Sequence, residues 1–298
     1  MPELKISKRS AESQAASVMK ELQGTVIKSV GTVRNYEQSL TRVAQWIKDN
    51  KAANHIKHLT PELAYRYLEQ RGQQVGQKTL DMDRQAIQAM FGNVTGHLKP
   101  GETLTVIKSE QQQALKSRAY TPEQAKLIAN AQTPRNALAT ELAHAAGLRA
   151  HELFTLAPQA ERAADERPAL DTKWQDREGE IYTVAGKGGL VREILIPAEL
   201  ATRLEAQRLT EVVRITDRGI HYEQRYDIAG GKNWSNSFSA AANRTLGWSE
   251  GAHGLRHSYA QERMNALQSQ GLTRDLALET VSQEMGHFRP EITETYLR

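Results

Sequence analysis

The chain has 298 residues, of which 25% are charged and 39% are hydrophobic, a composition typical of a folded protein rather than a disordered one. It holds no cysteine, which excludes disulfides, thiolate metal ligands and cysteine nucleophiles. No apolar run approaches the roughly 18 residues of a membrane span, and the first residues lack the apolar segment of a secretory signal. We therefore expect a cytoplasmic protein with no membrane partner.

The net charge of +4 is unevenly distributed along the chain. The first 118 residues hold 18 of the 39 basic residues and 11 of the 35 acidic ones, so this part carries +7 and the remainder −3. A basic segment of this kind favours a polyanionic partner, of which nucleic acid is the commonest. An ordinary solvated surface explains the charge equally well at this point.

The first third of the chain is predicted to form a small helical bundle with its basic residues outside. About 25 residues at the start are polar, and we expect them to be loosely ordered. Apolar residues at steps of three and four predict helices at 31–50, from Thr60-Pro61 onward, and at about 77–92. A loop and then a short helix are expected after residue 92. The side chains expected to face the core are Val33, Tyr36, Leu40, Val43, Ile47, Leu63, Tyr67, Leu68, Leu80, Ile87, Met90 and Phe91.

A polar stretch at residues 108–118 is predicted to link two domains. Beyond it, Thr121, Pro122 and Gln124 form the capping-box pattern that begins a helix. A second helix is expected at about 134–146, with Gly147 at its end. One strand pair, 181–184 with 191–196, surrounds a Gly-Lys-Gly-Gly turn. Residues 157–180 are expected to be irregular, and further helices are expected at about 198–209, 257–270 and 274–285.

Four short stretches of the second part hold groups suited to chemistry. In "GLRAHEL", Arg149 is followed three residues later by Glu152. Lys187 lies at the tip of the predicted hairpin. The last two stretches are "HGLRHSYA", with His253 and Arg256, and "GHFRPEITETYLR", with His287 and Tyr296.

Each of these residues also has a plain structural explanation. Arg149 can simply pair with Glu152, Lys187 can be a solvated turn residue, and a terminal tyrosine can anchor the last helix. His253 and His257 have the i, i+4 spacing of a metal pair, but no glutamate follows the first histidine, so a capping or core role is favoured. The turn "AGKGGL" lacks the first glycine and the Ser/Thr of a phosphate-binding loop.

Together, these side chains suit the cleavage of a phosphodiester bond without a metal. That reaction needs a nucleophile, cations that neutralise the charge building on the phosphate oxygens, and an acid that protonates the departing alkoxide. A tyrosine hydroxyl can serve as the nucleophile. Arginine suits the second task, because its planar fork binds two phosphate oxygens at once, and a lysine on a hairpin tip suits the third.

The four stretches occur in the same order as the signature of the tyrosine recombinases, the phage-integrase family, and the chain resembles that family from about Tyr120 to Arg298. The basic first third is similar to the family's core-binding domain. The resemblance implies a mainly α fold with a small antiparallel β-sheet. A helical core-binding domain (residues 1–110) would precede a mixed α/β catalytic domain (residues 118–298). The ending is most like the integrases of bacterial integrative elements.

The resemblance also implies a role for each site residue. Tyr296 would attack the scissile phosphate and form a 3′-phosphotyrosyl link, with Arg149 and Arg256 on the phosphate oxygens. Lys187 would be the general acid, His253 would handle protons, and His287 would bind the phosphate by a hydrogen bond. Glu152 would support an arginine or a histidine.

The resemblance implies double-stranded DNA as substrate, a homotetramer on paired DNA sites, accessory DNA-bending or excision factors, and neither cofactor nor metal. The expected function is integration or excision of a mobile element. A Xer-like dimer resolvase, a topoisomerase and a non-catalytic DNA-binding regulator are the alternatives. Only two residues follow Tyr296, and the stretch before the first predicted helix is short. We therefore expect neither the family's usual protomer-docking segment nor an arm-binding domain.

Overall fold

A computed structural model describes residues 9–24, 26–27, 30–112 and 116–298. The described residues separate into two compact units, which divide after Ala114. Residues 113–115 of the predicted linker lie outside the described residues, as do the first eight residues of the chain. None of the described helices is both long and apolar enough to cross a membrane.

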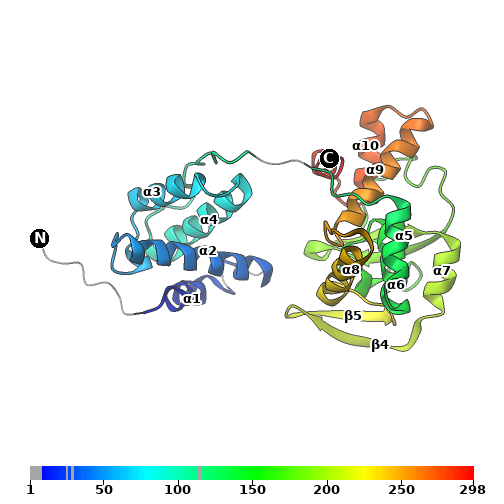
Figure 1. The fold of residues 1–298 in the computed structure, drawn as a ribbon, viewed down its shortest axis with the longest axis horizontal. Helices are drawn as coiled ribbons and strands as arrows, with labels where there is room; N and C mark the ends of the chain where they lie inside the picture. The colour runs from blue at the N-terminus through cyan, green and yellow to red at the C-terminus, as the bar shows by residue number, and fades with distance from the viewer. Residues whose placement is uncertain (1–8, 25, 28–29, 113–115) are drawn as a thin grey trace, which may run out of the picture. The chain divides into compact units, whose positions relative to one another are not determined.

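The first unit is built from four helices, α1 (Ala11–Leu22), α2 (Val30–Asp49), α3 (Pro61–Gly72) and α4 (Gln77–Met90). Helix α2 packs against both α1 and α4, and α3 packs against α4 (Figure 1). A short 3₁₀ turn, Ile56–His58, precedes α3, which begins at Pro61 with Thr60 as its N-cap. The helices predicted at 31–50, from Thr60-Pro61 onward and at about 77–92 are confirmed, and the side chains expected to face the core are buried or pack against it.

Two expectations for the first unit are wrong. The start of the chain is not loosely ordered throughout, because residues 11–22 form α1 and bury Ala11, Ala15, Val18, Met19 and Leu22. These residues recur at the helical steps of three and four, but the alanines among them are small and weakly hydrophobic, which is why this helix was not predicted. The segment after α4 continues as one π-helical turn, Phe91–Thr95, and residues 96–112 contain no helix.

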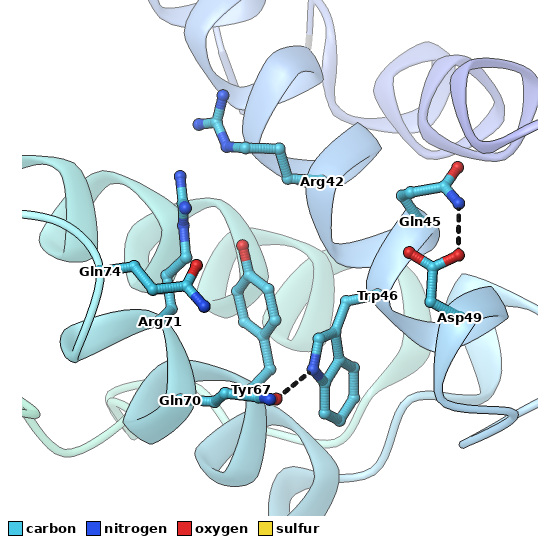
Figure 2. Close-up of a pocket in the computed structure, with 8 residues that line it drawn as sticks. All are labelled: Arg42, Gln45, Trp46, Asp49, Tyr67, Gln70, Arg71 and Gln74. Carbon is cyan, nitrogen blue, oxygen red and sulfur yellow. Dashed lines mark hydrogen bonds between the residues drawn. The ribbon is translucent and has the colours of Figure 1, made fainter.

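A buried carboxylate joins three helices of the first unit. Asp83 on α4 accepts hydrogen bonds from Arg42 on α2 (2.9 Å), and from Arg71 (3.2 Å) and Tyr67 (3.0 Å) on α3. Burial, and then the nearby Asp83 carboxylate, raise the pKa of the Tyr67 hydroxyl, which therefore stays a donor. Figure 2 shows the pocket that Arg42, Tyr67 and Arg71 of this cluster help to line, where the indole of Trp46 donates to Gln70 (2.6 Å). Guanidinium, amide, indole, phenol and carboxylate groups thus line the pocket.

The second unit begins with α5 (Pro122–Asn130) and α6 (Pro134–Ala146). The capping box of Thr121 and Gln124 is present, and Gly147 ends α6 in the left-handed conformation (φ 59°, ψ 41°). Strands β2 (Glu180–Ala185) and β3 (Val191–Ile196) pair antiparallel, with Ala185 opposite Val191 at the turn. The two-residue strand β1 (Ala157–Pro158) adds to β2, and the rest of residues 157–179 is irregular, as expected.

Five further helices follow in the described part of this unit: α7 (Ala198–Glu205), α8 (Gly231–Leu246), α9 (Gly254–Ser269), α10 (Arg274–Glu284) and α11 (Pro290–Thr293). A 3₁₀ turn, η5 (Glu294–Tyr296), follows α11. Helix α9 packs against α6, α10 and η5 (Figure 1). One core cluster extends from Tyr120, just before α5, to Leu255 at the start of α9, and a second lies between α9, α10 and the last residues of the chain.

A second hairpin corrects the expectation of a single strand pair. Strands β4 (Arg208–Asp217) and β5 (Ile220–Tyr226) pair antiparallel around Arg218 and Gly219, which both have positive φ, as a tight two-residue hairpin turn requires. Most β4 side chains are exposed, so the strand shows no alternation of polar and apolar residues. Helix α7 ends at Glu205 rather than near 209 because β4 begins at Arg208. The expected fold class, mainly α with small antiparallel sheets, is confirmed.

Candidate active site

Arg149 and Glu152 lie in the turn that follows α6. The left-handed Gly147 ends the helix against the ring of Tyr259, where an added Cβ would come within 2.7 Å of a ring carbon. The chain then turns so that the backbone N–H of Arg149 donates to Glu152 (2.8 Å), while its guanidinium pairs with the same carboxylate (2.7 Å). Glu152 is fully buried, whereas the side chain of Arg149 keeps 23% of its surface exposed. Arg149 can therefore reach a ligand while one of its nitrogens stays fixed.

Arg256 is fully buried near the start of α9. Its guanidinium donates to the carbonyl oxygens of Gly147 and Met285 and to Nε2 of His287 (2.9 Å). The Nε of Arg256 is buried and has no hydrogen-bond partner among the described residues. Burial, followed by the repulsion of Arg149, lowers the pKa of Arg256 to about 10, so it stays charged at neutral pH.

His287 is neutral, and its tautomer follows from its partners. A guanidinium can only donate, so Nε2 of His287 accepts from Arg256. Nδ1 therefore carries the proton and donates to the hydroxyl of Thr293 (2.9 Å). Burial, and then the cations Arg256 and Arg149, lower the pKa of His287 to about 3. Arginine and histidine are thus held together as one hydrogen-bonded pair.

The ring of Tyr296 lies against this pair. Its centroid is 5.1 Å from that of the His287 ring, and the guanidinium carbon of Arg256 is 5.6 Å from the Tyr296 centroid. The ring centroids of His257 (4.8 Å) and His253 (5.5 Å) are also close. Tyr296 is only 9% exposed, and its carbonyl oxygen accepts a hydrogen bond from Gln261 on α9 (3.1 Å). The end of the chain is therefore docked on α9 beside the two arginines.

The other two histidines are also uncharged at neutral pH. Burial, and then Arg256 and His257, lower the pKa of His253 to about 4. Burial, and then Arg118, lower the pKa of His257 to about 4. Their rings are 5.7 Å apart, but no group of three or more His, Cys, Asp or Glu side chains among the described residues could hold a metal ion. A neutral histidine beside a tyrosine can accept a proton.

The charges of this site favour an anionic ligand. Arg149, Arg192 and Arg256 surround one buried carboxylate, that of Glu152. Burial would raise the pKa of Glu152, but the three arginines outweigh it and hold that pKa below its usual range. Three cations against one anion leave a positive surplus in a largely buried place, where a phosphate group would restore the balance.

The hairpin between β2 and β3 begins beside the Arg149–Glu152 pair. A Cβ added to Gly186 would lie 3.3 Å from Glu152 Oε1 and 3.8 Å from a guanidinium nitrogen of Arg149. Lys187 follows in a short 3₁₀ turn, with its backbone next to the site. The side chain of Lys187 lies outside the described part of the chain.

The fold thus brings Arg149, Glu152, His253, Arg256, His287 and Tyr296 together. Sequence reasoning missed Arg192, a buried arginine on β3 that also binds Glu152 (2.9 Å), and the close contact of His257 with Tyr296. A signal for Arg192 exists, because the period of two along β3 places it on the same face as the buried Ile194 and Ile196. A charge on a buried strand face needs a partner.

A scan against protein-family models found no match, and a search of curated proteins found none either. Among solved structures, the chain resembles the XerH site-specific recombinase bound to palindromic difH substrate, with a TM-score of 0.59 and 13% identity over 99% of this chain and 95% of that one. It also resembles lambda integrase in a tetramer on a Holliday junction (TM-score 0.58, 18% identity, 97% and 78% covered). A third match is the Tn1549 transposon integrase with transposon right-end DNA (0.54, 14%, 97% and 95%). The chain therefore has the tyrosine-recombinase fold.

Proposed function

We propose that this protein is a site-specific tyrosine recombinase that cuts and rejoins duplex DNA through a covalent 3′-phosphotyrosyl intermediate at Tyr296. Residues 1–110 act as a DNA-binding domain and residues 118–298 as the catalytic domain. The observation that carries the proposal is the packing of the Tyr296 ring against Arg256 and His287, beside the Arg149–Glu152 pair.

The proposed reaction is a transesterification at phosphorus. The hydroxyl oxygen of Tyr296 bonds to the scissile phosphorus, and the bond from phosphorus to the 5′ oxygen breaks with its electron pair on that oxygen. Lys187 gives the departing oxygen its proton, and the proton of Tyr296 passes to the neutral His253. Rejoining reverses these steps with another 5′-hydroxyl, so the exchange conserves the number of phosphodiester bonds.

The two arginines stabilise the charge that builds on the non-bridging oxygens. Arg149 offers the exposed part of its guanidinium, whereas Arg256 is fully buried, and its unpartnered Nε–H becomes accessible to the phosphate only when the Tyr296 ring beside it moves. Because Arg149 is held by the buried Glu152, it needs little reorganisation when the transition state forms. His287 binds Arg256 through Nε2 and Thr293 through Nδ1, so in this arrangement it orients Arg256 and would have to give up one of these bonds to donate to the phosphate.

The proposed biological role is the integration or excision of a mobile element by four protomers on two DNA sites. Three of the similar structures support this role: a lambda integrase tetramer on a Holliday junction, a transposon integrase on transposon DNA and a recombinase bound to difH substrate. The basic first 118 residues would contribute phosphate contacts. A substrate with two sites separates recombination from topoisomerase activity, since relaxation leaves the sequence order unchanged.

The test is covalent capture of DNA in the presence of EDTA. Nicked duplexes that tile the DNA flanking the gene are incubated with the protein, and adducts that resist denaturation are counted on a gel. We expect an adduct with the wild type and with Tyr182→Phe, a control tyrosine of the same unit that binds Glu205 instead. Tyr296→Phe should bind DNA but form none. An adduct formed by Tyr296→Phe would remove Tyr296 as the nucleophile.

A further inference from the structure

Arg192 is a buried cation on β3, and its two ends are bound to different parts of the site. Its side chain is 3% exposed. One terminal nitrogen donates to Glu152 Oε2 (2.9 Å), and the other donates to the carbonyl oxygen of Glu284 at the end of α10 (2.7 Å). These partners are far apart in the sequence, so only the tertiary fold brings them within reach of one guanidinium.

Each partner of Arg192 leads directly to one of the proposed phosphate-binding arginines. Glu152 holds Arg149 through its other carboxylate oxygen (2.7 Å). Glu284 is followed by Met285, whose carbonyl oxygen accepts from Arg256, and then by Gly286 and His287, which also binds Arg256. Arg192 therefore spans the gap between the segment that fixes Arg149 and the segment that fixes Arg256.

We propose that Arg192 is a positioning residue that sets the separation of Arg149 and Arg256, so that both can bind one phosphate. This inference rests on the proposed recombinase function. Arginine suits the task because its fork donates in two directions at once from a rigid plane, whereas a lysine carries a single nitrogen. The backbone makes room for it, because a Cβ at Gly286 (φ +70°) would lie 2.3 Å from Cδ of Arg192.

A purely structural role would have a different consequence. If Arg192 only neutralised a buried carboxylate, its loss would lower stability and leave the site geometry intact. In a positioning role, its loss leaves Glu152 Oε2 with the backbone N–H of Arg149 alone. The carboxylate would then draw the Arg149 guanidinium inward, and the 284–287 segment would lose its link to Glu152. The rate of cleavage would fall even in the folded fraction.

The experiment compares Arg192→Met and Arg192→Lys with Arg263→Met. Arg263 is an equally buried arginine of α9 that pairs with the side chain of Glu284 (2.8 Å) and, among the described residues, forms no hydrogen bond or ion pair with Glu152, so it controls for lost stability. Single-turnover adduct formation is measured at saturating nicked DNA and normalised to the folded fraction. We expect both Arg192 variants to react about 10²-fold more slowly, the cost of a small misplacement of a reacting group. Affinity for DNA and the rate of Arg263→Met should change little.

A double-mutant cycle then identifies the route of the effect. In an Arg149→Ala background, Arg192→Met should cause little further loss of rate, because the residue it positions is already gone. An equal loss in both backgrounds, or wild-type rates in both Arg192 variants, would overturn the positioning role while the recombinase function stands.

If the wild type forms no adduct, a measurement that does not depend on catalysis can still test the positioning role of Arg192 separately from the recombinase function. The guanidinium N–H signal of Arg149, assigned by its loss in Arg149→Lys, is followed by NMR. We expect it to shift and to exchange faster with water in both Arg192 variants but not in Arg263→Met. An unchanged Arg149 signal in the folded Arg192 variants would refute the inference.

Discussion

At the scale of single residues, Arg149 and Arg256 are held in different ways. A side-chain carboxylate fixes Arg149, and Glu152 would keep Arg192 as a partner if Arg149 were removed. Arg256 instead satisfies two buried carbonyl oxygens, those of Gly147 and Met285. A buried acceptor that loses its donor costs about 1–3 kcal/mol. The two arginines should therefore differ in what they contribute to stability, although both contribute to catalysis.

Arg149→Ala and Arg256→Ala test this difference. We expect both to bind DNA and to form the adduct about 10²–10³-fold more slowly, the usual cost of losing one transition-state donor. Only Arg256→Ala should also lower the midpoint of thermal unfolding clearly. Arg203→Ala, which removes an exposed partner of Glu141, serves as the control for both measurements. Wild-type rates in both site variants would refute the phosphate clamp.

At the scale of elements, the docking of η5 on α9 depends on histidines that are neutral. The pKa values of His257 and His253 are about 4 in the folded protein, against an ordinary value near 6.5. Unfolding releases these rings into water, where they bind protons more readily. Between about pH 6.5 and pH 4 the unfolded state therefore binds more protons than the folded state, and this difference destabilises the folded protein increasingly as the pH falls. Above about pH 6.5 the histidines are neutral in both states and have no such effect.

We therefore expect the free energy of unfolding to fall as the pH is lowered from 6.5 to 4.5. His257→Gln should make that fall shallower, since it removes one of the titrating groups. Urea denaturation at a series of pH values measures both curves. Parallel curves for the wild type and the variant would show that His257 does not titrate in this way.

The helices and strands also show how much of the fold could be predicted from the sequence. The helix from Pro134 to Ala146 was predictable to the residue, because proline and glycine act locally at its ends. The residues proposed for the site were selected from their motifs, and the fold brings most of them together. Arg192 could be recognised only as a buried cation on β3, and its partners Glu152 and Glu284 could not be predicted because they are reached only through tertiary contacts. The hairpin β4–β5 was missed because exposed strands carry no burial pattern.

At the scale of the whole molecule, the two units have separate hydrophobic cores. The first unit has its own cluster, and the clusters of the second unit draw no residue from it. The proposed nucleophile and phosphate-binding arginines all belong to the second unit. Much of the surplus positive charge lies in the first. Binding and chemistry should therefore be separable.

We expect fragments 9–112 and 116–298 to fold independently and to unfold cooperatively. Only the second should form an adduct, and it should do so at higher DNA concentrations than the full chain. With about six to ten phosphate contacts, the affinity of the full chain should fall by roughly 10³–10⁵ between 50 and 200 mM salt. Circular dichroism and binding titrations measure these properties. An adduct formed by fragment 9–112 would contradict the division of roles.

The most direct test of the covalent mechanism is to locate the bond between protein and DNA. The adduct formed on nicked DNA is digested with protease and nuclease, and the modified peptide is sequenced by mass spectrometry. We predict a nucleotide attached through its 3′ phosphate to Tyr296, in the peptide that ends at Arg298. A nucleotide attached to any other residue, or through its 5′ phosphate, would contradict the account.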